Sequence, residues 1–180
     1  LHSPLQEHFR YPAFRPGQEP ALRHVLAAHD TLVVMPTGSG KSLIYQLAAM
    51  LLPGTALVFS PLIALMKDQV DSMRKRGIPA TYINSSLDPA EADRRVRGLV
   101  AGEYKLVLVA PERLRSGHFR GALMNAGLNL LVLDEAHCLS QWGHDFRPDY
   151  LRLGEARRKL GNPPVAAFTA TATPLVRADI

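Results

Sequence analysis

The chain has 180 residues, 47% of them hydrophobic, which suits one domain with one sizeable core and excludes a disordered chain. Its net charge of +5, from 21 basic and 16 acidic side chains, is compatible with an anionic partner, although much of it is expected to be solvated helix surface. The single cysteine, Cys138, excludes an internal disulfide and favours a reducing cytoplasm.

Short apolar runs alternate with amphipathic stretches along the whole chain. We expect strands at residues 31–35, 56–60, 80–84, 105–109, 130–134 and 165–169. Runs that are apolar throughout are typical of strands buried on both faces. The alternation therefore predicts an α/β fold, a parallel β-sheet flanked by helices on both faces.

Between these runs, apolar residues recur at helical spacing and predict helices that each present one apolar face. The residues sharing these faces are Ile44, Leu47, Ala48 and Leu51 in one helix and Leu62, Leu65, Met66 and Met73 in the next. Two further helices are expected to begin where a capping side chain precedes proline, at Asp88-Pro89 and at Thr173-Pro174.

The two ends of the sequence predict a piece of a longer protein. The chain begins at Leu1 rather than Met, and its last expected helix runs to Ile180 without a glycine stop. No apolar run approaches the roughly 20 residues of a membrane span, and no signal peptide heads the chain. We therefore expect no membrane partner, and a monomeric fragment.

The stretch PTGSGKS, residues 36–42, lies between an expected strand and an expected helix, as a phosphate-binding loop does. Its glycines permit a tight turn that aims N–H groups at phosphate, and the helix adds its positive end. Lys41 is placed to reach the β- and γ-phosphates of ATP, and Ser42 to bind Mg²⁺. The expected nucleotide-binding residues are Thr37, Gly38, Ser39, Gly40, Lys41 and Ser42. Met35 departs from the general pattern, which has glycine there, and a chance glycine turn is the alternative.

The acidic pair Asp134 and Glu135 directly follows another expected strand. Ligands of parallel sheets bind at the carboxyl ends of strands, so the pair is expected beside the glycine loop. Asp134 is then suited to hold Mg²⁺, usually through water, and Glu135 to take a proton from the water that attacks the γ-phosphate. Alone, the sequence DEAH could equally cap a helix.

Together, PTGSGKS and DEAH resemble the nucleotide site of superfamily 2 helicases. FRPGQ (14–18), PLIALMKDQV (61–70), APERL (110–114), DEAHCLSQWGHDFRPDY (134–150) and FTATAT (168–173) then resemble, in order, motifs of the RecQ family of DNA helicases. The resemblance covers nearly the whole chain but only the first of two RecA-like lobes. It implies an ATP-dependent 3′–5′ DNA helicase that unwinds DNA when the second lobe is joined to this one, the lobe alone being nearly inactive.

The resemblance also implies roles for single residues. Gln18 would read adenine through its amide, and Arg15 would lie against the nucleotide. Lys67 would contact a DNA phosphate, and Arg113 would help to shape the DNA track. A polar residue near a helix start and a solvated lysine are the plainer interpretations of Gln18 and Lys67. Thr169 and Thr171 would connect the nucleotide site to the surface that binds DNA. The alternative is that their hydroxyls are ordinary capping groups at the end of a strand.

In the RecQ family the loop after DEAH is rich in aromatic residues and senses single-stranded DNA. Here Trp142 and Phe146 offer flat faces for stacking on bases, and Arg147 can pair with a phosphate or stack. Gly143 permits movement, and His137 would relay it to the acidic pair. The alternatives are that Trp142 is packed in the core and that His137 is a hydrogen-bonded core histidine.

The sequence leaves rival functions open. His137, Cys138 and His144 do not make a zinc site, because no second cysteine exists. An RNA helicase of the same superfamily would share the fold and the ATP site, and a non-catalytic nucleotide-gated binding module is a further alternative. The resemblance implies ATP and Mg²⁺ as cofactors, and single-stranded and junction DNA as partners. It also implies work in DNA repair and recombination, at the bacterial nucleoid or in the eukaryotic nucleus.

Overall fold

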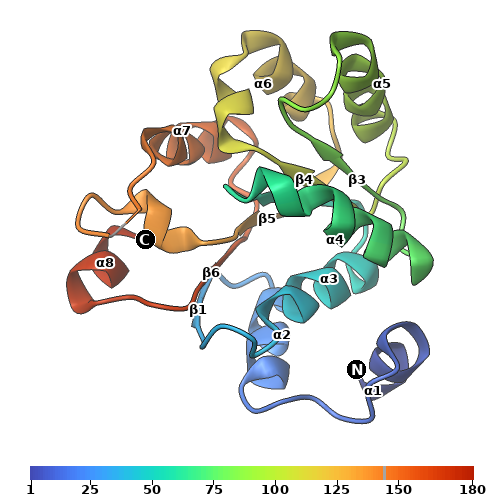
Figure 1. The fold of residues 1–180 in the computed structure, drawn as a ribbon, viewed down its shortest axis with the longest axis vertical. Helices are drawn as coiled ribbons and strands as arrows, with labels where there is room; N and C mark the ends of the chain where they lie inside the picture. Colours follow the sequence, from blue (N-terminus) through green and yellow to red (C-terminus); the bar gives the residue numbers. More distant parts are fainter. Residues whose placement is uncertain (144) are drawn as a thin grey trace.

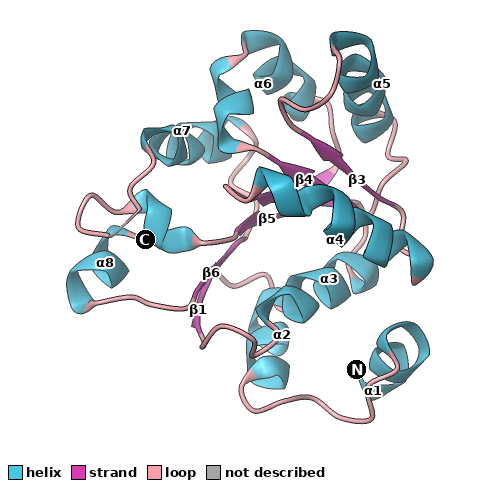
Figure 2. Cartoon of the chain, in the orientation of Figure 1, coloured by secondary structure: helices cyan, strands magenta, loops and turns pink. Residues whose placement is uncertain are grey.

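The computed structural model describes residues 1–143 and 145–180, which form a parallel β-sheet between two layers of helices (Figures 1 and 2). The strands are β1 (Thr31–Val34), β2 (Thr55–Phe59), β3 (Ala80–Ile83), β4 (Leu106–Val109), β5 (Leu128–Leu133) and β6 (Val165–Thr169). They lie in the order β1-β6-β5-β2-β4-β3, and all neighbours are parallel. The predicted class is confirmed, and each predicted strand is found to within two residues at either end.

The helices cover both faces of the sheet. Those of regular α type are α1 (His2–Pro4), α2 (Gln18–Leu26), α3 (Lys41–Leu51), α4 (Ile63–Lys75), α5 (Pro89–Val100), α6 (Gly117–Met124), α7 (Arg152–Lys159) and α8 (Pro174–Asp179). Tighter or wider turns form η1 (Leu5–Phe9), η2 (Pro111–Arg115), η3 (Ala136–Leu139) and η4 (Pro148–Leu151). None of the helices in the described ranges is both long enough and apolar enough to cross a membrane.

Two cores, one on each face, hold the layers together. The strands alternate between them: in β2, Ala56 and Val58 pack toward α2, α3 and α4, whereas Leu57 and Phe59 pack toward α5, α6 and α7. Because both faces are covered, every residue of β2 is buried. Figure 1 shows the two helix layers on opposite sides of the strands.

The predicted helix starts are confirmed by their caps. Asp88 Oδ1 accepts the N–H of Glu91 at 2.8 Å, and Thr173 Oγ1 accepts the N–H of Val176 at 3.3 Å. Most residues on the two expected apolar faces are buried, but three are not: Leu51, Leu62 and Leu65 are 40%, 38% and 48% exposed. The shared apolar face is therefore only partly buried. Leu62 and Leu65 face a cavity instead, and Leu51 is the last residue of α3.

The order of the strands brings distant segments to one edge of the sheet. β6 lies between β1 and β5, so the segments that follow β1 and β5 emerge on the two sides of it. The N–H of Met35 donates to Thr169 O at 3.1 Å, and the N–H of Asp134 donates to Phe59 O at 2.9 Å. These bonds extend the strand pairing to the start of the glycine loop and of the acidic pair.

Candidate nucleotide site and the adjoining aromatic loop

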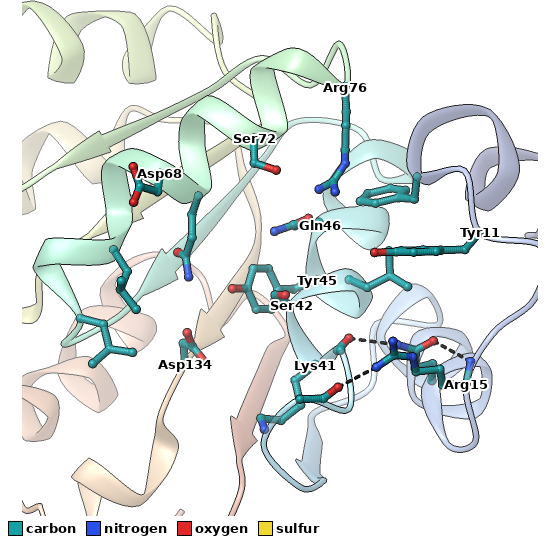
Figure 3. Close-up of a pocket in the computed structure, with 18 of the residues that line it drawn as sticks. Tyr11, Arg15, Lys41, Ser42, Tyr45, Gln46, Asp68, Ser72, Arg76 and Asp134 are labelled. Atoms are coloured by element: carbon teal, nitrogen blue, oxygen red, sulfur yellow. Dashed lines mark hydrogen bonds between the residues drawn. The ribbon is translucent and has the colours of Figure 1, made fainter.

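A cavity of about 810 Å³ opens at this edge, between the glycine loop, α4 and the segment that precedes α2. Lys41, Ser42, Asp134 and Glu135 all line it, as Figure 3 shows for the first three. The structure therefore brings the two predicted motifs to one cavity, although more than 90 residues separate them in the sequence.

The glycine loop has the conformation that a phosphate site needs. Gly38 and Gly40 have φ of 81° and 83°, values that a residue with a side chain rarely adopts. Helix α3 begins directly after Gly40, so its unpaired N–H groups face the loop. Thr37 is exposed, whereas the hydroxyl of Ser39 is buried and has no hydrogen-bond partner among the described residues. The cradle thus offers donors to an anion.

The ammonium group of Lys41 lies over the start of the loop. Its Nζ donates to Met35 O at 3.0 Å and to Pro36 O at 3.2 Å. Ser42 follows in the first turn of α3 and lines the same cavity. A cation and a hydroxyl beside the N–H groups at the start of a helix suit a phosphate chain with its divalent ion.

Arg15 and Gln18 tie the preceding segment to the glycine loop. Gln18 is 2% exposed, and its Oε1 accepts the N–H of Arg15 at 2.8 Å. Its Nε2 donates to the carbonyls of Ser39 and Gly40, each at 3.1 Å, and the Arg15 guanidinium donates to Gly38 O at 2.6 Å. Both ends of the Gln18 amide are thus engaged by protein, so contact with adenine would require at least one of these bonds to be exchanged. Its reading of adenine stays a prediction.

The acidic pair combines burial with mutual repulsion. Burial first, and then the negative charge of Glu135, raise the pKa of Asp134 to about 6. The N–H of Glu135, which donates to Asp134 Oδ1 at 3.1 Å, and the charge of Lys41 lower it in part. Asp134 and Ser42 are oxygen ligands at the edge of one cavity, so these residues fit Mg²⁺, which would further favour the ionised carboxyl.

Sequence reasoning missed several residues of the cavity. Tyr11, 44% exposed, and Arg76 also line it, and the guanidinium of Arg76 lies 5.2 Å from the centre of the Phe9 ring (Figure 3). Tyr45 is buried at its base, and its pKa is raised by burial and then by the charge of Asp134. In the sequence, Tyr11 stands out only as an aromatic residue shortly before FRPGQ. The residues around Arg76 gave no indication that it would line the cavity.

His137 connects the acidic pair to the threonine motif. It is 7% exposed, and its Nδ1 lies 2.9 Å from Thr169 Oγ1 and 3.4 Å from Glu135 Oε2. Thr169 is fully buried, and its hydroxyl also donates to Thr171 O at 3.0 Å. His137 is therefore a buried, hydrogen-bonded histidine that joins the two motifs, and its role as a relay between the aromatic loop and the acidic pair stays a prediction.

The tip of the loop after DEAH lies outside the core. Trp142 is 71% exposed, which excludes the alternative that it is a core residue. Phe146 is half-buried, and the exposed Arg147 pairs with Asp145 at 3.2 Å. None of these three predicted DNA-binding residues lines the nucleotide cavity.

Gly143 has a packing role as well as the freedom expected of it. A Cβ atom there would lie 2.6 Å from His137 O, closer than real Cβ atoms approach a backbone, and 3.2 Å from Ser140 O, which is tighter than most. The loop therefore returns tightly against η3. A residue with a side chain at position 143 would push the loop away from η3.

The two remaining DNA contacts predicted from sequence also lie away from the cavity. Lys67 is exposed on α4 and pairs with Asp71 at 2.7 Å, which raises the pKa of Lys67. Arg113 lies in η2, where its Nε has no hydrogen-bond partner within residues 1–143 and 145–180. The geometry leaves Lys67 in the solvated position of the plainer interpretation, whereas the unbonded Nε of Arg113 is buried, so its contact with DNA stays a prediction.

The metal expectation concerned His137, Cys138 and His144, of which His144 lies outside the described residues. Ligand atoms of His137, Cys138 and Asp145 lie within 4.8 Å of one another. Burial raises the pKa of the Cys138 thiol to about 12, however, and the thiol is oriented toward Asp145 Oδ2 at 3.7 Å. The absence of a zinc site stays a prediction from the sequence.

Comparison with known proteins decides the family. A family model described as DEAD/DEAH box helicase matches residues 15–178. This chain belongs to the DEAD/DEAH box helicase family. The solved structure of a hypothetical ATP-dependent RNA helicase from Sulfolobus tokodaii superposes with a TM-score of 0.76 at 20% identity, over 99% of this chain and 53% of that one. That likeness confirms the helicase fold.

Within this helicase family, the resemblance to RecQ is confirmed. The ATP-dependent DNA helicase RecQ of Bacillus subtilis is 49% identical over 178 residues, which are 98% of this chain and 30% of that protein. RecQ of Haemophilus influenzae is 43% identical over 178 residues, 99% of this chain and 29% of that protein. The chain thus spans less than a third of the length of these relatives.

Proposed function

We propose that this chain is the ATP-binding lobe of a RecQ-type 3′–5′ DNA helicase. The observation that carries the proposal is the single cavity that joins the glycine loop to Asp134 and Glu135, with an exposed aromatic loop directly beyond them. The RecQ relatives, named as ATP-dependent DNA helicases, support DNA as the substrate. The proposal includes a second RecA-like lobe, joined to this one in the same protein.

The nucleotide would be held by groups that the structure already places around the cavity. Tyr11 and Arg15 present a ring and a guanidinium to a base, and Gln18 lies beside them. The N–H groups of residues 38–42 and the ammonium of Lys41 bind the phosphates. Mg²⁺, held by Ser42 and Asp134, would neutralise charge on the phosphates.

Glu135 is the proposed general base. Its carboxylate shares the cavity with Lys41 and lies beside His137, which links it to Thr169. A carboxylate in this position can orient the attacking water and accept its proton. An arginine from the second lobe would stabilise the charge that develops on the γ-phosphate.

DNA would bind on the side of the exposed loop. Trp142 can stack on bases without regard to sequence, and Arg147 and Arg113 can contact phosphates. The loop leaves the acidic pair through η3, so its displacement on DNA can reach the catalytic carboxylates. Lys67 would add a phosphate contact after release from Asp71.

Two rivals differ from this proposal in measurable ways. The RNA helicase alternative shares the whole ATP site, but the sequence relatives favour DNA. A non-catalytic binding module would bind ATP without turning it over, and the presence of Lys41, Asp134 and Glu135 argues against it.

The test uses the full-length protein that contains this chain. ATP hydrolysis is measured with no nucleic acid, with single-stranded DNA and with single-stranded RNA, and unwinding is followed on duplexes with 3′ or 5′ tails. We expect stimulation by DNA, unwinding from the 3′ tail, and loss of both in Lys41→Ala. Stimulation by RNA alone would favour the RNA helicase, and ATP binding without hydrolysis would favour the binding module.

A further inference from the structure

The loop after DEAH is anchored to the acidic pair at its far end as well as at its start. Tyr150, in η4, is fully buried, and its hydroxyl donates to the backbone carbonyl of Asp134 at 3.1 Å. A side chain from the end of the loop therefore holds the backbone at its beginning.

That carbonyl belongs to a constrained part of the backbone. Glu135 adopts a left-handed conformation, with φ of 54° and ψ of 49°, which is uncommon for a residue with a side chain. Such a conformation persists only where surrounding contacts stabilise it, and it concentrates at functional sites. The peptide between Asp134 and Glu135 is planar, so its carbonyl and its N–H turn together.

Hydrogen bonds fix this peptide from both sides. Its N–H donates to Asp134 Oδ1 at 3.1 Å, and its carbonyl accepts from Tyr150 at 3.1 Å. The neighbouring peptides are held as well: the N–H of Asp134 donates to Phe59 O at 2.9 Å, and Glu135 O accepts the N–H of Cys138 at 3.0 Å. Of the groups within residues 1–143 and 145–180 that donate to or accept from this peptide, Tyr150 alone comes from outside the acidic pair.

Tyr150 is itself held firmly. The N–H of Arg147 donates to Cys138 O at 2.8 Å, which closes the base of the loop just before η4. The neighbouring Asp149 forms a two-pronged ion pair with Arg115 of η2, at 2.7 and 2.8 Å. The tyrosine is thus a fixed support rather than part of the exposed tip.

We propose that Tyr150 is a positioning residue: its hydroxyl holds the Asp134–Glu135 peptide so that Glu135 keeps its left-handed backbone and directs its carboxylate into the nucleotide cavity. This inference rests on the proposed function, because it takes Glu135 as the general base. It adds a second connection between the loop and the catalytic carboxylates, separate from the contact of His137 with Glu135.

Tyr150→Phe in the full-length protein is the direct test, because it keeps the ring and removes only the donor. We expect kcat for ATP hydrolysis to fall about fivefold, the usual consequence of losing one neutral hydrogen bond. The KM for ATP and the affinity for DNA should stay within about twofold, since the groups that bind both are untouched. Tyr82→Phe, at a half-buried tyrosine on β3, is the matched control and should change neither value.

A double substitution separates positioning from packing. If Tyr150 acts through Glu135, adding Tyr150→Phe to Glu135→Gln should not slow single-turnover hydrolysis further, because the group being positioned is already lost. A full additional fivefold loss in that background would overturn the inference. So would Tyr150→Phe with normal kcat, or with a raised KM and a melting temperature lowered by many degrees.

The same experiments distinguish this inference from the proposed function. Slow hydrolysis by Glu135→Gln together with normal hydrolysis by Tyr150→Phe would overturn the role of Tyr150 and leave the proposed function intact. A wild-type protein that hydrolyses no ATP under any condition would overturn both.

Discussion

The glycine loop and the loop after DEAH contrast in how their polar and aromatic groups are held. In the first, Arg15 and Gln18 are bonded to the carbonyls of residues 38–40, so the cradle is fixed before any ligand binds. In the second, the base is fixed but Trp142 is 71% exposed at the tip. In the proposed function, nucleotide binding would therefore use a preformed site, whereas DNA sensing would use an exposed tip above a fixed base.

The largest expected effect tests whether the preformed cradle suffices for chemistry. The 180-residue chain alone should bind ATP weakly and hydrolyse it about 10³–10⁵-fold more slowly than the full-length protein, because the arginine finger of the second lobe is missing. Steady-state ATP hydrolysis by both proteins, with and without DNA, measures the ratio. Robust DNA-stimulated turnover by the chain alone would contradict the proposed division of the site.

The next effect separates binding from chemistry within the cradle of the full-length protein. Glu135→Gln keeps the shape and loses the base, so turnover should fall about 10²–10⁴-fold while ATP still binds. Lys41→Ala removes the cation at the phosphates and should weaken ATP binding itself. Nucleotide binding and hydrolysis are measured on the same samples, and normal hydrolysis by Glu135→Gln would show that another group is the base.

At the exposed tip of the loop, we expect a substitution to have a small effect on DNA binding and a large effect on the stimulation of ATP hydrolysis by DNA. Trp142→Ala in the full-length protein should keep DNA affinity within about tenfold, since one stack is worth about 1–3 kcal/mol and phosphate contacts dominate affinity. Basal ATP hydrolysis should stay near normal, whereas its stimulation by DNA and unwinding should be lost. Titration of single-stranded DNA, followed by anisotropy and ATP hydrolysis together, measures both.

The control for that experiment is Met124→Ala, which removes another exposed apolar side chain, 61% accessible on α6. It should leave stimulation unchanged. Intact stimulation in Trp142→Ala would remove the loop from the proposed DNA sensor.

The smallest effect concerns the stability of the metal-free chain. The pKa of Asp134 is raised from 3.8 to about 6, so the folded state keeps a proton that the unfolded chain loses between these values. The contribution of Asp134 to the free energy of unfolding therefore falls as the pH rises from about 4 to about 6, and it stays at the lower value at higher pH. Asp134→Asn should raise the melting temperature by a few degrees at pH 8 in EDTA, and by less at pH 4.5.

The matched control is Asp93→Asn, at an exposed carboxylate on α5, which should show no such difference between the two pH values. An equal gain for Asp134→Asn at both pH values would mean that its carboxyl titrates normally in the fold.

Local sequence patterns were sufficient for the sheet and for the helix starts. Apolar runs such as 165–169 are strands because both faces of the sheet are covered, and the caps at Asp88 and Thr173 depend only on residues three positions away. Phosphate-loop and acidic motifs could be placed together because strands of a parallel sheet end at one edge. These features rest on short-range chemistry.

What the sequence could not predict depends on neighbours far along the chain. Helical spacing grouped Leu62 and Leu65 with core residues, but it does not reveal that their side of α4 faces a cavity. Gln18 was expected to bind adenine, and its bonds to the glycine loop follow only from how α2 packs beside α3. The bond from Tyr150 to the Asp134 carbonyl likewise requires the return path of the whole loop.

The place of β1 at the edge of the sheet bears on how the protein is made. Within the described sheet β1 pairs with β6 alone, and β6 is the last of these strands to leave the ribosome. While translation proceeds from the N-terminus, β2, β3, β4 and β5 can pair as they emerge, but the strand that carries the glycine loop has no neighbour. A chain whose translation stops before residue 165 therefore lacks the strand that pairs with β1, so the glycine loop is expected to become ordered only late in synthesis.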